Sequence, residues 1–206
     1  MIKYIVFDFD GTIADTFEVI KNIAINEYGE YAVDFDFESI KNEDTKGLLK
    51  KLNIPLWKLP EMSLKITSKL RNNKDIKLFP GIIDLLTNLK KNYKLGILSS
   101  NSRENIIATL KEHKIDNLFE FVYSGSSIFG KHLVLKKMCS KQQINPHEVI
   151  YVGDEERDII ASKKARIKNI AVTWGFNSKE KLSREKPDYI VDSPMQIIEI
   201  VQNLYQ

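Results

Sequence analysis

Two aspartates near the N-terminus stand where a metal-assisted reaction could use them. Asp8 and Asp10 follow a short apolar run, Ile5–Phe7, whose residues favour a buried strand. Residues two apart on a strand share a face, so the two carboxylates are expected to lie close together beyond the strand. Like charges held together are costly unless a cation offsets them, and a hard divalent ion with oxygen ligands would do so. Such a pair could handle phosphate, although Asp10-Gly11 alone indicates no more than a turn.

Polar residues also follow a second apolar run, Leu95–Leu98. Ser99, Ser100 and Asn101 come directly after it. A hydroxyl and free backbone N–H groups at a strand end, next to a helix N-terminus, can form a cradle for an anion. A plainer alternative is that Asn101 or Ser102 only caps the next helix.

Two later segments add charged groups of the types that phosphate chemistry needs. Lys131 opens an expected helix and could neutralise phosphate oxygens, although a lysine in so lysine-rich a chain is most often solvated. The apolar run Val149–Val152 ends in Gly153-Asp154, and Asp158 follows at the start of a helix. Asp158 could act only on the helix dipole. Asp154 would complete a carboxylate cluster with the two N-terminal aspartates, and this donor set suits Mg²⁺.

The elements that must position these residues alternate from residue 79 onward. The expected helices are 82–91, 102–112, 131–141, 157–164 and 194–204, and the expected strands are 94–98, 119–123, 149–152, 169–173 and 189–191. This alternation predicts an α/β protein with a Rossmann-like three-layer α/β/α core, in which helices cover both faces of a parallel sheet. Ligand sites in such sheets lie beyond the carboxyl ends of the strands.

Residues 15–78 interrupt the alternation with helical patterns. A first helix is expected after a cap at Asp15-Thr16, and others at about 38–52 and 57–71, with a possible aromatic strand at 35–37. We expect a small all-helical cap domain over residues 15–78 and a core formed by residues 1–14 and 79–206. The alternative is an extension of the core.

Composition excludes several classes of protein. Of 206 residues, 43% are hydrophobic and 29% are charged, which is typical of a globular protein. The net charge of +3 comes from scattered residues, so nucleic acid is not an expected partner. The single cysteine, Cys139, excludes an internal disulfide, fits a reducing compartment and is interpreted as a packing residue. With neither a signal-like segment nor a long charge-free span, the sequence predicts a cytoplasmic protein without membrane association.

Taken in order, the four polar segments resemble the motifs of the haloacid dehalogenase superfamily. The resemblance is to the phosphatase branch with a helical cap inserted after the first motif, similar to phosphoglycolate phosphatases and β-phosphoglucomutases. The motifs are Asp8-Phe9-Asp10-Gly11-Thr12, Ser99, Lys131 and Gly153–Asp158. An acid at Asp10 fits neither the dehalogenases nor the P-type ATPases of the superfamily.

The resemblance implies a role for each motif residue. Asp8 would be the nucleophile, and Asp10 the general acid and then the general base. Ser99 and Lys131 would hold the phosphate oxygens. Gly11, Thr12 and Ser100 would assist in binding the substrate. The implied Mg²⁺ ligands are Asp8, Asp10 through its backbone carbonyl, Asp154, and Asp158, which could instead orient Lys131.

Two residues depart from the family pattern. Glu155 stands where many relatives have serine or threonine, and His132 follows Lys131 where proline is common.

The implied activity is that of a Mg²⁺-dependent phosphatase acting on a small phosphomonoester, either phosphoglycolate-like or a sugar phosphate, through an aspartyl-phosphate. One alternative is a phosphomutase of the β-phosphoglucomutase type, which shares every core motif. Another is a non-catalytic binding module on the same fold. A monomer or a homodimer is expected.

Overall fold

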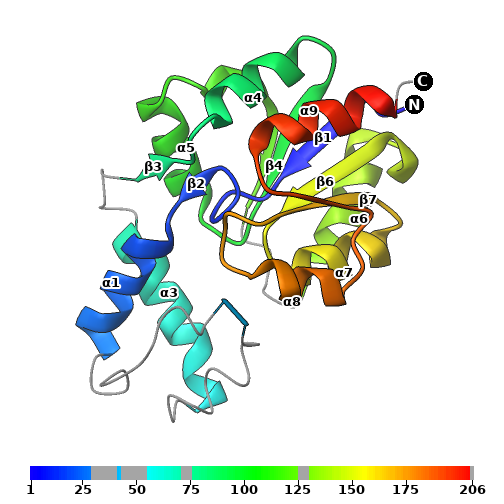
Figure 1. The fold of residues 1–206 in the computed structure, drawn as a ribbon. Helices are drawn as coiled ribbons and strands as arrows, with labels where there is room; N and C mark the ends of the chain where they lie inside the picture. The colour runs from blue at the N-terminus through cyan, green and yellow to red at the C-terminus, as the bar shows by residue number, and fades with distance from the viewer. Residues whose placement is uncertain (29–40, 43–54, 71–75, 125–129, 205–206) are drawn as a thin grey trace.

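A six-stranded parallel sheet forms the centre of the molecule (Figure 1). The computed structural model describes residues 1–28, 41–42, 55–70, 76–124 and 130–204. The strand order is β5-β4-β1-β6-β7-β8. The strands are β1 (Tyr4–Phe7), β4 (Lys94–Leu98), β5 (Phe119–Tyr123), β6 (Val149–Gly153), β7 (Lys168–Val172) and β8 (Tyr189–Val191).

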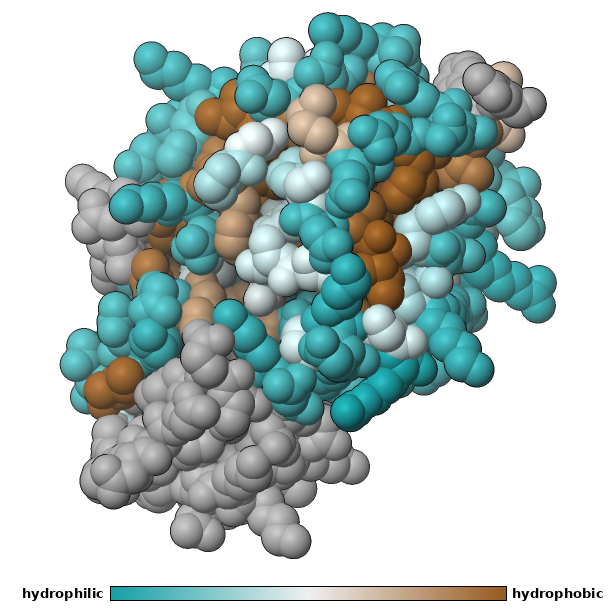
Figure 2. Space-filling model, in the orientation of Figure 1, coloured by the Kyte–Doolittle hydropathy of each residue, from teal (hydrophilic) through white to brown (hydrophobic). Residues whose placement is uncertain are grey.

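Helices cover both faces of this sheet, as Figure 1 shows. On one face lie α4 (Ile82–Lys90), α5 (Arg103–Glu112) and α9 (Pro194–Asn203), and on the other α6 (Lys131–Gln142), α7 (Glu156–Ala165) and α8 (Lys179–Arg184). Alternation along β1 explains the two layers, because Ile5 and Phe7 pack with α4 and α9 whereas Val6 packs with α6 and α7. Hydrophilic side chains predominate on the face seen in Figure 2. The predicted three-layer α/β/α core is confirmed.

The predicted helices and strands after residue 79 all occur, with ends within one residue of the expected ones. Cys139 is buried between α6 and the sheet, in agreement with its interpretation as a packing residue. The short helix α8 was not predicted, because six residues are too few to show a helical period. Two single 3-10 turns, η4 (Asp116–Leu118) and η5 (Pro146–Glu148), precede β5 and β6.

The inserted segment contains α1 (Phe17–Tyr28), the turn η3 (Leu56–Lys58) and α3 (Leu59–Leu70). Helices α1 and α3 pack against each other beside the core (Figure 1). Glu27 of α1 forms an ion pair with Lys65 of α3 at 2.5 Å. Helix α3 confirms the predicted helix at 57–71. The predicted helix at 38–52 falls almost wholly outside the described residues, and the possible strand at 35–37 lies outside them.

The expectation that residues 15–78 are all-helical is wrong at both ends of the segment. Strands β2 (Ala14–Asp15) and β3 (Lys77–Leu78) pair antiparallel, and α1 begins only at Phe17. The outgoing and returning chains run past each other in opposite directions, so pairing satisfies backbone groups that would otherwise lack partners.

Among the described residues, no helix is long and apolar enough to cross a membrane.

The strand register brings three polar segments to one edge of the sheet. Phe7 of β1 pairs with Ile97 of β4 and with Val152 of β6. The three neighbouring strands therefore end almost level with one another, and Asp8, Ser99 and Asp154 follow them at the carboxyl edge of the sheet.

Candidate active site

Three buried carboxylates form the centre of this site. Asp8 follows β1, Asp154 follows β6, and Asp158 lies in the first turn of α7. Their exposed fractions are 2%, 0% and 1%, and one oxygen of each lies within 4.8 Å of the others. The sequence predicted a cluster of the Asp8, Asp10 and Asp154 carboxylates. In the structure, the carboxylate of Asp158 takes the place of that of Asp10. Asp10 instead turns its carboxylate toward Asn101.

Lys131 lies between two of these carboxylates. It is the first residue of α6, it is 3% exposed, and its Nζ lies 2.6 Å from Asp8 Oδ2 and 2.5 Å from Asp158 Oδ1. Burial alone would lower the pKa of Lys131, but the charges of Asp158 and Asp8 outweigh it and hold this pKa well above its ordinary value. Lys131 is thus a buried ammonium ion, and the alternative of a solvated surface lysine is wrong.

Asp158 serves Lys131 and the helix at once. Its Oδ1 accepts from Lys131, and its Oδ2 accepts from the backbone N–H of Glu155 at 3.1 Å as part of a capping box of α7. Asp158 was expected either to bind Mg²⁺ or to orient Lys131, and the structure shows the contact with Lys131.

Asp154 carries the clearest sign of uncompensated negative charge. Its Oδ1 accepts from the Thr12 hydroxyl and its Oδ2 from the backbone N–H of Phe176, both at 2.7 Å. Burial, followed by the charges of Glu155 and the other cluster carboxylates, nevertheless raises the pKa of Asp154 well above its ordinary value. Three buried carboxylates that share one ammonium group are a donor set that fits a hard divalent cation.

Two glycines let the backbone approach Asp154. Gly11 has φ of +77°, and a Cβ there would lie 2.2 Å from Asp154 Oδ2. A Cβ on Gly175 would lie 2.3 Å from the same oxygen. Gly175 and the N–H of Phe176 were not predicted, although a glycine shortly after β7, at the same sheet edge, was an available signal.

The Asp10 carboxyl group is held apart from the cluster, and the residue is partly buried. Its Oδ1 accepts from Asn101 Nδ2 at 3.1 Å, and its Oδ2 lies 3.5 Å from Ser99 Oγ. Burial and the charge of Asp8 raise the pKa of Asp10 to about 6, against the opposing effect of Asn101. The cap of α5 is Ser102, and Asn101 accepts at its Oδ1 from the Ser102 N–H and from Asn105, which leaves its Nδ2 to donate to Asp10. Asp10 can therefore hold or release a proton near neutral pH.

The other predicted phosphate-binding residues gather at the same edge. Ser99 is fully buried, and its Oγ accepts from the N–H of Asn101 at 3.1 Å. Ser100, beside it, is partly exposed. The Thr12 hydroxyl is directed to Asp154. Roles of Gly11, Thr12 and Ser100 toward a substrate stay predictions.

Glu155, the departure from the family pattern, forms an ion pair with Arg157. The charges of Glu155, Asp158 and Asp8 raise the pKa of Arg157 against the effect of burial. The additional negative charge beside Asp154 is therefore partly offset within the same segment.

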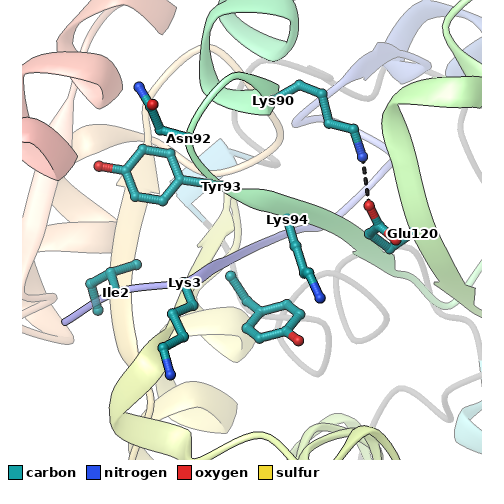
Figure 3. A pocket seen from close by; sticks show the side chains of 8 residues that line it. Ile2, Lys3, Lys90, Asn92, Tyr93, Lys94 and Glu120 are labelled. Carbon is teal, nitrogen blue, oxygen red and sulfur yellow. Dashed lines mark hydrogen bonds and ion pairs between the residues drawn. The ribbon is translucent and has the colours of Figure 1, made fainter.

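A separate pocket lies at the opposite edge of the sheet, near the amino ends of β1 and β4 (Figure 3). Its volume is about 400 Å³, and its lining includes Tyr4, Lys94, and the ion pair of Lys90 with Glu120 at 2.7 Å. None of the carboxylates described above lines it.

Comparison with known proteins agrees with this geometry. Residues 5–172 match the family model described as haloacid dehalogenase-like hydrolase. A phosphoglycolate phosphatase from Synechococcus elongatus is 32% identical over 97% of both chains, and the pyrophosphatase PpaX from Bacillus cereus is 26% identical over 98% of both. A haloacid dehalogenase-like hydrolase from Streptococcus pneumoniae superposes with a TM-score of 0.81 at 26% identity, covering 97% of this chain and 98% of that one. The family model spans most of the chain, so this protein belongs to the haloacid dehalogenase-like hydrolase family.

Proposed function

We propose that the protein is a Mg²⁺-dependent phosphatase that hydrolyses a small phosphomonoester through an aspartyl-phosphate intermediate on Asp8. The observation that carries this proposal is the buried ammonium of Lys131 held against Asp8, with a second acid, Asp10, poised near neutral pH beside them. Phosphoryl transfer needs mainly positioning and charge stabilisation, and these groups supply both.

Asp8 acts as the nucleophile. One carboxylate oxygen forms a bond to phosphorus while the bond from phosphorus to the ester oxygen breaks. The N–H of Phe9 donates to Asp8 Oδ1 at 2.7 Å, and Lys131 donates to Oδ2, so the carboxylate is oriented from two sides. The ammonium also reduces repulsion between this carboxylate and an approaching phosphate. Ser99 would donate to a non-bridging phosphate oxygen.

Asp10 moves the proton in both half-reactions. In its protonated form it gives a proton to the leaving oxygen, and the alcohol departs. The resulting carboxylate then takes a proton from the water that attacks the aspartyl-phosphate. This second step releases inorganic phosphate and restores Asp8. Asn101 supports the role, because its amide orients the Asp10 carboxyl group.

The proposed Mg²⁺ ligands are Asp8, Asp154, Asp158 and the backbone carbonyl of Asp10. The elevated pKa of Asp154 and the closeness of the three carboxylates support a cation at this point. When bound, the cation would neutralise charge on the phosphate oxygens.

We further propose that residues 1–14 and 79–206 form the catalytic core and residues 15–78 a cap that selects the alcohol part of the substrate. The ring of Phe176, whose N–H holds Asp154, lies 5.6 Å from the ring of Phe17 in α1, centroid to centroid. Core and inserted segment therefore meet directly beside the site. The names of the relatives favour phosphoglycolate-like esters and pyrophosphate as the first compounds to test, and the resemblance to β-phosphoglucomutases adds sugar phosphates.

The test is a panel of 2-phosphoglycolate, sugar phosphates and pyrophosphate, assayed for phosphate release with Mg²⁺ and with a chelator. We expect release that requires Mg²⁺, a radiolabelled phosphoryl group trapped on the protein, and loss of both in Asp8→Asn. Asp84→Asn, a matched change at an exposed position of α4, should leave turnover unchanged. Undiminished activity in Asp8→Asn would exclude the covalent route, and isomerised glucose phosphate in place of free phosphate would identify a mutase.

A further inference from the structure

Tyr151 connects two of the groups assigned to phosphate binding, although it lies beneath the site. It belongs to β6, is fully buried, and packs in the core layer between the sheet and helices α6 and α7. Its neighbour in the sheet is Val6 of β1, which it pairs with in register. The side chain reaches across β1 to the end of β4, where its hydroxyl donates to the carbonyl of Leu98 at 3.0 Å.

This hydrogen bond acts on the peptide unit that carries Ser99. The Leu98 carbonyl and the Ser99 N–H belong to one planar peptide group. The N–H end donates to the carbonyl of Tyr123 at 3.0 Å, and the carbonyl end accepts from Tyr151. With both ends held, the peptide plane cannot rotate without breaking a buried hydrogen bond, so the backbone from which the Ser99 side chain projects is held in place.

The ring of the same tyrosine faces Lys131. The Lys131 Nζ lies 5.5 Å from the centroid of the Tyr151 ring, within the range of a cation–π interaction. Asp8 and Asp158 hold the ammonium by charge, while the rigid ring lies against it and limits where it can settle.

We propose that Tyr151 is a positioning residue that sets the spacing between the Ser99 hydroxyl and the Lys131 ammonium. The inference rests on the proposed function, in which these two groups hold the transferring phosphoryl group. Tyr151 itself does not touch the substrate; its hydroxyl holds the peptide unit of Ser99, and its side chain lies against Lys131. Catalysis of this kind depends on such spacing. Preorganised donors lose much of their stabilising effect on the transition state when they are displaced by a small distance.

The first test is Tyr151→Phe, which keeps the ring and removes only the hydroxyl. We expect kcat/KM for p-nitrophenyl phosphate to fall about tenfold, with a similar rise in the inhibition constant of inorganic phosphate, as for the loss of one orienting hydrogen bond. Tyr93→Phe is the matched control. Tyr93 is also buried, and its hydroxyl donates to the carbonyl of Val201 at 3.2 Å, but it lies at the amino edge of the sheet. This control should leave both constants unchanged.

The decisive test is a double-mutant cycle with Ser99→Ala. If the hydroxyl of Tyr151 acts through Ser99, Tyr151→Phe should have little further effect on kcat/KM in the Ser99→Ala protein. A loosened core would instead lower activity by the same factor in both backgrounds, and that result would overturn the inference while leaving the role of Ser99 intact. An unchanged kcat/KM in Ser99→Ala alone would overturn the assignment of the phosphate clamp and this inference with it. Thermal unfolding of each variant verifies that the fold is retained.

Discussion

Removing divalent cations should make the protein lose stability as the pH rises from 5 to 8. The pKa values of Asp10 and Asp158 are both raised from 3.8 to about 6, mainly by burial. The folded state therefore binds these protons more tightly than the unfolded chain does. The resulting stabilisation is fully present below the unfolded pKa and disappears as the pH rises through the folded pKa.

The size of the effect follows from these values. A carboxyl group with a folded pKa of about 6 and an unfolded pKa of 3.8 contributes roughly 1 to 2 kcal/mol at pH 5 and almost nothing at pH 8. The stabilisation that the two groups contribute together therefore falls by about 3 kcal/mol between pH 5 and pH 8. For a chain of this size, such a fall lowers Tm by roughly 5–10 °C. Asp154 adds a loss in the same direction, because its pKa is also raised. Carboxylates with lowered pKa values, such as Glu148, have gained their stabilisation by about pH 5 and do not oppose the trend.

The assay is thermal unfolding followed by circular dichroism at pH 5.0, 6.5 and 8.0, with a chelator and then with Mg²⁺. Mg²⁺ should raise Tm most at pH 8, where the carboxylates it binds are ionised. Asp154→Asn should retain part of the pH dependence, because Asp10 and Asp158 remain, but should lose the Mg²⁺ shift. Asp84→Asn, which changes an exposed charge, should retain both. A Tm in chelator that is constant or rises between pH 5 and 8 would refute the reasoning, as would an undiminished Mg²⁺ shift in Asp154→Asn.

Three further substitutions test the charge balance and the backbone of the site. Lys131→Met leaves Asp8 and Asp158 buried without their counter-charge. Urea unfolding in chelator should show that the free energy of unfolding falls by roughly 3–5 kcal/mol. A fall of less than about 1 kcal/mol would contradict the buried ion pairs. Asp158→Asn weakens one proposed Mg²⁺ ligand and one partner of Lys131, so kcat should fall at least about 10- to 100-fold. Wild-type kcat would show that both contacts are dispensable. In Gly11→Ala the new Cβ would lie 2.2 Å from Asp154 Oδ2, at a backbone φ of +77°. The Mg²⁺ concentration for half-maximal activity should therefore rise more than tenfold. An unchanged Mg²⁺ requirement would show that the backbone can move aside.

Much of the core could be predicted because its signals are local. Apolar runs such as Ile5–Phe7 and Val149–Val152 are short, rich in strand formers and followed by polar residues, and they form β1 and β6 as expected. The alternation of such runs with helical patterns was sufficient for a parallel sheet, and the rule that ligands bind beyond the strand ends located Asp8, Ser99 and Asp154 at one edge.

Contacts between distant segments could not be predicted in the same way. The pairing of β2 with β3 joins two-residue strands more than sixty positions apart, and neither strand is long enough to show a period. From the sequence, Asn101 was interpreted as a possible helix cap. Only the packed structure shows that its amide donates a hydrogen bond to Asp10. Tyr151 gave no functional signal, since a buried tyrosine in an apolar strand fits an ordinary core position.

The sequence by itself determined the kinds of group available and the sheet edge at which they gather, because residue type and strand period are properties of short segments. The tertiary structure decided how these groups share their charge. It placed Lys131 between Asp8 and Asp158, directed the Asp10 carboxyl group to Asn101, and buried Asp154 among other carboxylates, which raises its pKa. Charge sharing depends on distances of a few ångströms and on exclusion of water, and both are set only when β1, β6, α6 and α7 pack together.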